Sequence, residues 1–271
     1  MNDRLLPDDD VEGAFHVKFG PTSQSWVDPA RPDLLLYEYV QHIAMVLDDM
    51  VMDAPEDQRL RLVHVGGAGM TLPRWVAWRR PRTAQIVLEP DSALVAEVRA
   101  KIPLPPRSGI KVRETDGRTG LEAMPADYAD VVILDAFRGW QVPGELVTRQ
   151  ALETIHRVGR GKRLVVVNVT DTAPFHWAKR VFAAVAERWP HVALGAETPV
   201  HKGKRFGNLL FVGTDSRLGM GYITKQSSTL PFGYRWLEGR DARAWPGGAV
   251  PFSDGEHATS PQPAPGKVWF S

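Results

Sequence analysis

Apolar runs and amphipathic stretches alternate along the middle of the chain, between residues 59 and 214. The runs are rich in Val, Ile and Leu, and the stretches between them repeat apolar residues at helical spacing. Such alternation is typical of a parallel sheet covered by helices on both faces. Two closely spaced final runs predict an antiparallel edge. The expected strands are Leu60–Val65, Ala84–Leu88, Ile110–Val112, Asp130–Leu134, Leu164–Val169, Val192–Leu194 and Leu209–Val212.

The two flanking regions differ from this pattern. Residues 1–58 form a short N-terminal segment with an acidic start, a strand around Ala14–Phe19 and a helix from about Asp33 to Met52. Residues 215–271 are rich in Gly, Pro and Ser, which predicts an irregular tail. We therefore expect an α/β protein with a Rossmann-like, mostly parallel sheet over residues 59–214.

Acidic residues follow several of the expected strands. Glu89, Asp116, Asp135 and Asp171 each stand at or just after a strand end, and Gly66–Gly69 follow the first strand. The carboxyl ends of parallel strands share one edge of the sheet, where ligands bind. Helix capping can explain any single Asp in such a place. The four acids together favour a ligand site at this edge.

The spacing favours a nucleoside as the ligand. The glycines Gly66, Gly67 and Gly69 allow backbone to approach a ligand, with a helix N-terminus behind them. Glu89, 20 residues after Gly69, can accept hydrogen bonds from both ribose hydroxyls. Asp116, beside Gly117, can accept one from an adenine amino group. The phosphate-binding patterns G-x-x-x-x-G-K-[ST] and G-x-G-x-x-G do not occur, so an S-adenosyl compound fits better than NAD.

Composition narrows the function classes. The chain has no cysteine, which excludes disulfides, thiolate metal sites and cysteine nucleophiles. Its net charge of +1 does not suit a nucleic-acid-binding protein, and its eight scattered histidines predict no metal site. Neither an export signal nor an apolar stretch of about 20 residues occurs, so we expect a cytoplasmic protein without a membrane partner.

Charge is unevenly divided between the two halves of the chain. Residues 1–135 carry a net charge of −7 and residues 136–271 a net charge of +8. An acidic pocket for a cationic substrate in the first half would account for this difference. Two differently solvated faces would account for it equally well.

Several motifs resemble the spermidine synthase-like family, the polyamine aminopropyltransferases on the class I methyltransferase fold. They are HVGGAGMTLPRW, LEPD, RETDGR, VVILDAF and the upstream QSWVDPARPDLLLYEYVQH, and the resemblance covers about residues 15–214. It implies that Gln24 contacts the aminoacyl end of the S-adenosyl ligand and that Tyr37 makes a further ligand contact. It also implies that Glu89 holds the ribose, that Asp116 holds the adenine, and that Asp135 lies beside the sulfonium and the transferred chain.

Helix residues upstream extend the resemblance. Glu38 and His42 match the family's E-x-x-x-H, although their i, i+4 spacing would suit a surface pair equally well. Leu36 stands where the family has a tyrosine. The resemblance also suggests a homodimer.

Two departures from the family pattern bear on the reaction. The family's G-G-G-D-G-G corresponds to Val65–Met70, with Ala68 in place of the Asp that holds the amino end of the ligand. The second Asp of the family's D-x-x-D, which deprotonates the attacking amine, corresponds to Arg138. Two like charges about 4 Å apart repel by about 4 kcal/mol at an effective dielectric constant of 20, which argues against a putrescine-like amine. A different base is then needed, and Asp171 is the first candidate and His42 the second.

The resemblance implies a transferase that moves an aminopropyl group to an amine and releases methylthioadenosine. Decarboxylated S-adenosylmethionine or S-adenosylmethionine would be a cosubstrate, with no tightly bound cofactor. One alternative is an S-adenosylmethionine-dependent methyltransferase on the same sheet. The other is a non-catalytic homologue that binds a nucleoside or a protein partner.

Overall fold

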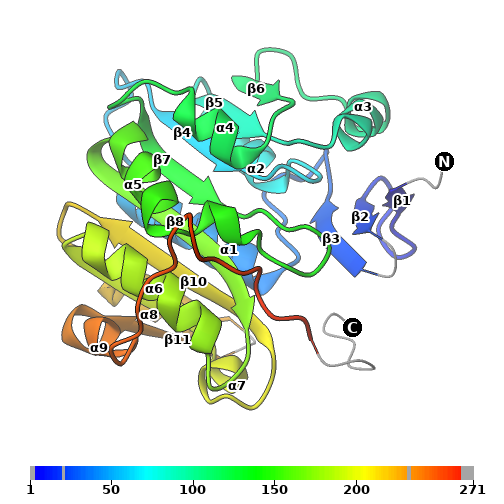
Figure 1. Cartoon of the computed structure of the whole chain (residues 1–271). Helices are drawn as coiled ribbons and strands as arrows, with labels where there is room; N and C mark the ends of the chain where they lie inside the picture. Colours follow the sequence, from blue (N-terminus) through cyan, green and yellow to red (C-terminus); the bar gives the residue numbers. More distant parts are fainter. Residues whose placement is uncertain (1–3, 20–21, 231–232, 264–271) are drawn as a thin grey trace.

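The computed structural model describes residues 4–19, 22–230 and 233–263, and its centre is an eight-stranded sheet (Figure 1). The strand order is β11-β9-β10-β8-β7-β4-β5-β6. Strands β4 to β8 pair in parallel, whereas β10 runs antiparallel to β8 and β9, and β11 runs antiparallel to β9. The predicted mostly parallel sheet with an antiparallel edge is therefore confirmed. The strands are β4 (Arg61–Val65), β5 (Ala84–Leu88), β6 (Ile110–Arg113), β7 (Ala129–Leu134), β8 (Gly159–Asp171), β9 (His191–Glu197), β10 (Gly207–Thr214) and β11 (Tyr234–Glu238).

Helices cover both faces of this sheet (Figure 1). Side chains alternate along each strand, so that Val63 and Val165 face one helical layer while Leu62 and Val166 face the other. The first layer contains α4 (Gly117–Glu122), α5 (Arg149–Val158) and α6 (His176–Arg188). The second contains α1 (Glu38–Leu47), α2 (Thr71–Arg79) and α8 (Gly221–Ser227). The other α-helices are α3 (Ser92–Lys101), α7 (Thr198–His201) and α9 (Gly239–Ala244), and two shorter helical turns are a π-helix at Asp48–Met52 and a 3-10 helix at Gly144–Leu146.

The N-terminal segment forms a second, three-stranded antiparallel sheet in the order β1-β2-β3. Its strands are β1 (Leu5–Pro7), β2 (Phe15–Phe19) and β3 (Thr22–Val27), and β1 packs on α3. The helix expected from Asp33 begins later, at Glu38. The Asp28 carboxylate accepts hydrogen bonds from the backbone N–H of Ala30 and Arg31, which holds this stretch in turns instead.

The region expected as an irregular tail is more ordered than its composition indicates. Helices α8 and α9 and strand β11 lie within it, and β11 extends the sheet. Tyr234 and Trp236 of β11 pack against His42 of α1, and the His42 and Tyr234 rings are stacked 3.5 Å apart. These aromatic contacts fix the strand although Gly and Pro surround it. The last described stretch, residues 245–263, has no regular helix or strand.

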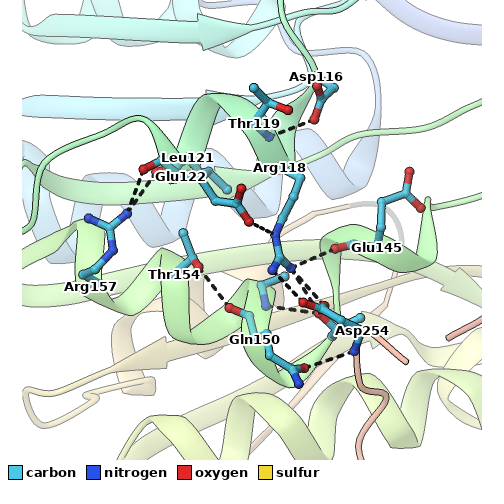
Figure 2. Close-up of polar contacts among 12 residues, drawn as sticks. Asp116, Arg118, Thr119, Leu121, Glu122, Glu145, Gln150, Thr154, Arg157 and Asp254 are labelled. Atoms are coloured by element: carbon cyan, nitrogen blue, oxygen red, sulfur yellow. Dashed lines mark hydrogen bonds and ion pairs between the residues drawn. The ribbon is translucent and has the colours of Figure 1, made fainter. Parts of the chain in front are cut away.

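That last stretch crosses the layer formed by α5 and α6 (Figure 1). Figure 2 shows Arg118 of α4 reaching Asp254, whose carboxylate oxygens lie 2.8 and 3.1 Å from the guanidinium. Farther along, the Ser260 Oγ accepts a hydrogen bond from the Val142 N–H, and the Ser260 N–H donates to the Val142 carbonyl. Residues 245–263 therefore brace the loop that follows β7.

No helix in the described part of the chain is long and apolar enough to cross a membrane.

Candidate active site

A cavity of about 580 Å³ lies at the carboxyl ends of β4, β5 and β7. The structure brings to it seven of the nine residues expected at the ligand site from the sequence. Two others lie elsewhere: Tyr37 lines a neighbouring cavity, and Gly69 packs beside Val17 and Val27 of the N-terminal sheet. The seven residues are Gln24, Gly66, Gly67, Glu89, Asp116, Gly117 and Asp135.

The glycine turn after β4 fits tightly against the strand ends. Gly66 has φ +96°, and a Cβ there would lie 2.2 Å from the Asp135 carbonyl oxygen, so no side chain can be accommodated. Ala68 and Met70 also have left-handed φ angles, +37° and +62°, which cost a non-glycine residue about 1 kcal/mol or more. The turn therefore keeps the left-handed backbone of a glycine-rich loop at two positions that lack glycine.

Glu89 ties the end of β5 to this turn. One carboxylate oxygen accepts hydrogen bonds from the N–H groups of Gly67 (3.0 Å) and Ala68 (3.3 Å), and the other accepts one from Asp91 (3.1 Å). Burial raises the pKa of Glu89, and the two backbone N–H groups of the turn oppose that rise. The carboxylate is thus fixed in the cavity wall, where it can accept further hydrogen bonds from a ligand.

Asp116 combines a structural role with a place in the cavity. Its carboxylate accepts a hydrogen bond from the Thr119 N–H at 2.9 Å and caps α4 (Figure 2). This contact with Thr119 lowers the pKa of Asp116, so the side chain stays ionised. Behind it, a Cβ on Gly117 would lie 2.3 Å from Val65 Cγ1, so glycine lets α4 approach β4.

Asp135 is the half-buried acid at the end of β7. It accepts a hydrogen bond from Asn168 Nδ2 at 2.9 Å and another from the Tyr39 hydroxyl. Burial raises the pKa of Asp135 to about 6, and these two donors limit the rise. Asn168 is fully buried, and its own Oδ1 has no hydrogen-bond partner among the residues that the structure describes. The carboxylate is therefore ionised at neutral pH, and falling pH neutralises it near pH 6.

A smaller cavity of about 60 Å³ adjoins the first. The two share Gln24, Tyr39, Phe137 and Gly139 as wall residues, and the Gln24 amide donates a hydrogen bond to the Gly139 carbonyl at 2.6 Å. Tyr39, which binds Asp135, therefore faces both spaces. The other residues around the smaller cavity are Ser23, Tyr37, Trp140, Thr170, Glu197, Arg205, Phe206, Gly207 and Asn208.

Arg138 lies at the rim of the larger cavity. Its side chain is 79% exposed, and its guanidinium is 3.5 Å from the Glu145 carboxylate. Solvent screens an exposed charge strongly. The repulsion expected from the sequence between Arg138 and an arriving amine is therefore much weaker here.

Asp171 lies outside the linings of both cavities, so the structure does not place this candidate base at the site. Its carboxylate accepts hydrogen bonds from the N–H groups of Thr172 (2.7 Å) and Ala178 (2.9 Å), which joins β8 to the start of α6. The acid at this strand end therefore has a structural role, because it accepts a hydrogen bond from the first turn of α6, whose N-cap residue is Phe175.

We expect Asp171→Ala to destabilise the protein by about 1–3 kcal/mol, because it leaves one buried and one partly buried N–H group without their acceptor. Urea unfolding measures this loss. Nucleoside affinity and turnover of the folded fraction should match wild type. A folded Asp171→Ala protein with selectively lost turnover would return Asp171 to the reaction.

His42 also lies outside both cavity linings. It is 1% exposed, it stacks on Tyr234, and its Nδ1 lies 3.2 Å from Ser227 Oγ. Burial lowers the pKa of His42 to about 4. This helix residue packs α1 against the C-terminal elements, and it does not reach the site. Its E-x-x-x-H neighbour Glu38 is the first residue of α1, and Leu36 is 49% exposed.

We expect His42→Phe to make the protein less sensitive to acid. Unfolded His42 gains a proton below pH 6.5 while the folded residue stays neutral to about pH 4, so wild type loses stability as the pH falls through this window. Urea unfolding at pH 7.5 and pH 4.5 should show about 2 kcal/mol less loss in the variant. Equal losses in both proteins would contradict this role.

The described residues include no group of three His, Asp or Glu side chains placed to hold a metal ion.

Sequence reasoning missed three residues of the site. Asn168 and Tyr39 hold Asp135, and Trp140 lines the smaller cavity. Asn168 carried a usable signal, because it is the polar residue inside the apolar run Leu164–Val169. Tyr39 and Trp140 carried none, since aromatic residues are equally common in cores.

Comparisons with known proteins agree with the resemblance found in the motifs. No family model matches the chain, and no curated protein matches it. Among solved structures, it is similar to a probable spermidine synthase from Corynebacterium glutamicum, with a TM-score of 0.85, 26% identity and 92% of each chain covered.

The fold comparison extends to methyltransferases. Human methyltransferase-like protein 13, solved in complex with SAH, has a TM-score of 0.55 at 17% identity, with 69% of this chain and 89% of that chain covered. At this identity the likeness concerns the fold. The chain thus has a class I methyltransferase fold, and its structure is similar to that of a probable spermidine synthase.

Proposed function

We propose that the protein transfers an aminopropyl group from decarboxylated S-adenosylmethionine to a primary amine and releases methylthioadenosine. The observation that carries the proposal is the pair of adjoining cavities with Asp135 and Tyr39 at their boundary. The larger space suits the nucleoside, with Glu89 at the ribose and Asp116 at the adenine. The smaller, aromatic-walled space suits the amine. Such a reaction belongs to polyamine biosynthesis.

In the proposed reaction, the nitrogen lone pair of the amine attacks the methylene carbon next to the sulfonium. The new C–N bond forms as the C–S bond breaks, and its electron pair goes to sulfur. The ionised Asp135 supports the cationic groups on both sides of this displacement, and the two cavities align the reactants. One proton leaves the amine, and sulfur becomes neutral in methylthioadenosine.

Methyl transfer from S-adenosylmethionine is the second candidate. Arg138 favours it, because the guanidinium at the cavity rim could pair with the carboxylate that the decarboxylated compound lacks. Ala68 favours neither reaction. It stands in place of the family's Asp, so the carboxylate that would hold the amino end of either S-adenosyl compound is missing.

Calorimetric titration and product analysis distinguish these candidates. Decarboxylated S-adenosylmethionine, S-adenosylmethionine and methylthioadenosine are titrated in turn, and each cosubstrate is then incubated with a panel of primary amines. Preference for the decarboxylated compound and release of methylthioadenosine support the proposal. Preference for S-adenosylmethionine and release of S-adenosylhomocysteine identify a methyltransferase. Binding of none of the three rejects both enzymes and leaves a non-catalytic homologue.

A further inference from the structure

A chain of hydrogen-bonded side chains leads from the smaller cavity into the N-terminal sheet. The Tyr37 hydroxyl, at the cavity wall, donates to Ser23 Oγ at 2.6 Å. Ser23 Oγ lies 3.0 Å from His16 Nδ1, and His16 Nε2 lies 2.9 Å from the Asp8 carboxylate. Each contact has normal hydrogen-bond length. Tyr37 and Ser23 thus connect the proposed amine space to the His16–Asp8 pair.

The donors and acceptors of this chain point in one direction. The Tyr37 hydroxyl donates its hydrogen to Ser23, so the Ser23 hydroxyl can donate its own hydrogen to His16 Nδ1. The other acceptor near Ser23, the Ser25 carbonyl, is farther away, at 3.5 Å. His16 then carries its proton on Nε2 and donates it to Asp8. In this arrangement the Nδ1 atom of His16 is the acceptor that faces the Ser23 hydroxyl.

Asp8 is held as an ion. Its carboxylate accepts hydrogen bonds from Trp26 Nε1 (2.6 Å) and from the N–H groups of Asp10 (2.8 Å) and Val11 (2.9 Å). Burial raises the pKa of Asp8, but these donors and His16 outweigh it, so the pKa lies below its usual value. The side chain of Asp8 is only 9% exposed, whereas that of His16 is 26% exposed. The ionised Asp8 is therefore a hydrogen-bond partner of His16, and the imidazole is partly exposed to solvent.

We propose that Tyr37, Ser23 and His16 form the proton relay that deprotonates the acceptor amine, with Asp8 as its counter-ion. The inference rests on the proposed aminopropyl transfer. It supplies a base for the amine, because Arg138 stands in place of the family's deprotonating Asp and because Asp171 and His42 lie outside the site. The N–H bond of the ammonium breaks as its proton passes to Tyr37. The Tyr37 proton moves to Ser23, and the Ser23 proton forms the new N–H bond on His16. Tyr37 and Ser23 end the step neutral.

The test measures methylthioadenosine release from decarboxylated S-adenosylmethionine with putrescine and 1,3-diaminopropane. We expect His16→Ala and Ser23→Ala to lower kcat by about 100-fold while the dissociation constant for methylthioadenosine stays within twofold of wild type. Added imidazole should restore turnover to His16→Ala but not to Ser23→Ala. His176→Ala, at an exposed histidine on α6, serves as the matched control and should resemble wild type.

Three results would overturn the relay. The first is wild-type kcat in folded His16→Ala. The second is a lower kcat in His16→Ala that added imidazole does not restore and that is accompanied by an equally large loss of nucleoside affinity. A purely structural role of His16 would give this result. The third is a wild-type protein that binds the nucleoside but releases no methylthioadenosine with any amine, which rejects the proposed function together with the relay.

Discussion

The Asp135→Asn variant is expected to lose at least about 100-fold in kcat and, at the same time, to become more stable at neutral pH. An amide has the shape of the carboxyl group but carries no charge, so it cannot support the sulfonium and the incoming amine. It can still accept the hydrogen bond from Asn168 and exchange one with Tyr39, so the local packing is preserved.

The gain in stability follows from the raised pKa. An Asp in the unfolded chain ionises near pH 3.8, whereas folded Asp135 holds its proton to about pH 6. Wild type therefore loses stability as the pH rises from about 4 to 6, and the neutral Asn does not. Above pH 6 we expect the variant to be more stable by about 1–3 kcal/mol, and below pH 4 the two should be equal.

Urea unfolding at pH 4 and pH 7.5, with kcat measured at pH 7.5, checks both halves of this prediction. Asp130→Asn is the matched control, since it changes the same residue type at the other end of β7. Asp130 lies 2.8 and 2.9 Å from the Arg160 guanidinium, so its loss should lower stability and leave nucleoside binding intact. An Asp135→Asn protein with wild-type turnover, or with lower stability at pH 7.5, would contradict the role given to Asp135.

The charge of the Asp135 carboxylate also predicts how the activity of the wild-type protein falls at acidic pH. Because the ionised form of Asp135 is the active one, kcat/KM should fall tenfold per pH unit once the pH drops below about 6. This fall should be absent from the residual activity of Asp135→Asn.

Glu89→Ala is expected to weaken nucleoside binding by at least about 100-fold, which corresponds to two hydrogen bonds from ribose hydroxyls to a charged acceptor. The substitution also removes the acceptor for the Gly67 and Ala68 N–H groups, so part of the loss reflects a less ordered turn. Calorimetric titration with methylthioadenosine measures the change directly.

Two further variants separate these contributions. Glu89→Gln keeps one oxygen that can accept from the turn but loses the charge, so its affinity should lie between those of wild type and Glu89→Ala. Glu122→Ala removes an exposed acid of α4 outside the cavity linings and should bind like wild type. A Glu89→Ala protein that binds within threefold of wild type would place the ribose elsewhere.

The sequence alone determined the central sheet and the residues of the larger cavity that stand at strand ends. The β-branched runs bury both faces, so the positions of the strands along the chain and their mostly parallel pairing follow from the pattern of apolar residues. Gly66, Glu89, Asp116 and Asp135 could be selected because parallel strands end at one edge, and strand ends are visible in a sequence.

Only the tertiary structure decided what each acid and histidine does. Asp171 and His42 were the candidate bases from sequence, but one accepts a hydrogen bond from the first turn of α6 and the other packs on Tyr234, 192 residues away along the chain. The relay from Tyr37 to Asp8 was invisible for the same reason, since its four residues lie on different elements. A pKa, an orientation or a hydrogen bond depends on neighbours distant in sequence, and only folding brings those neighbours together.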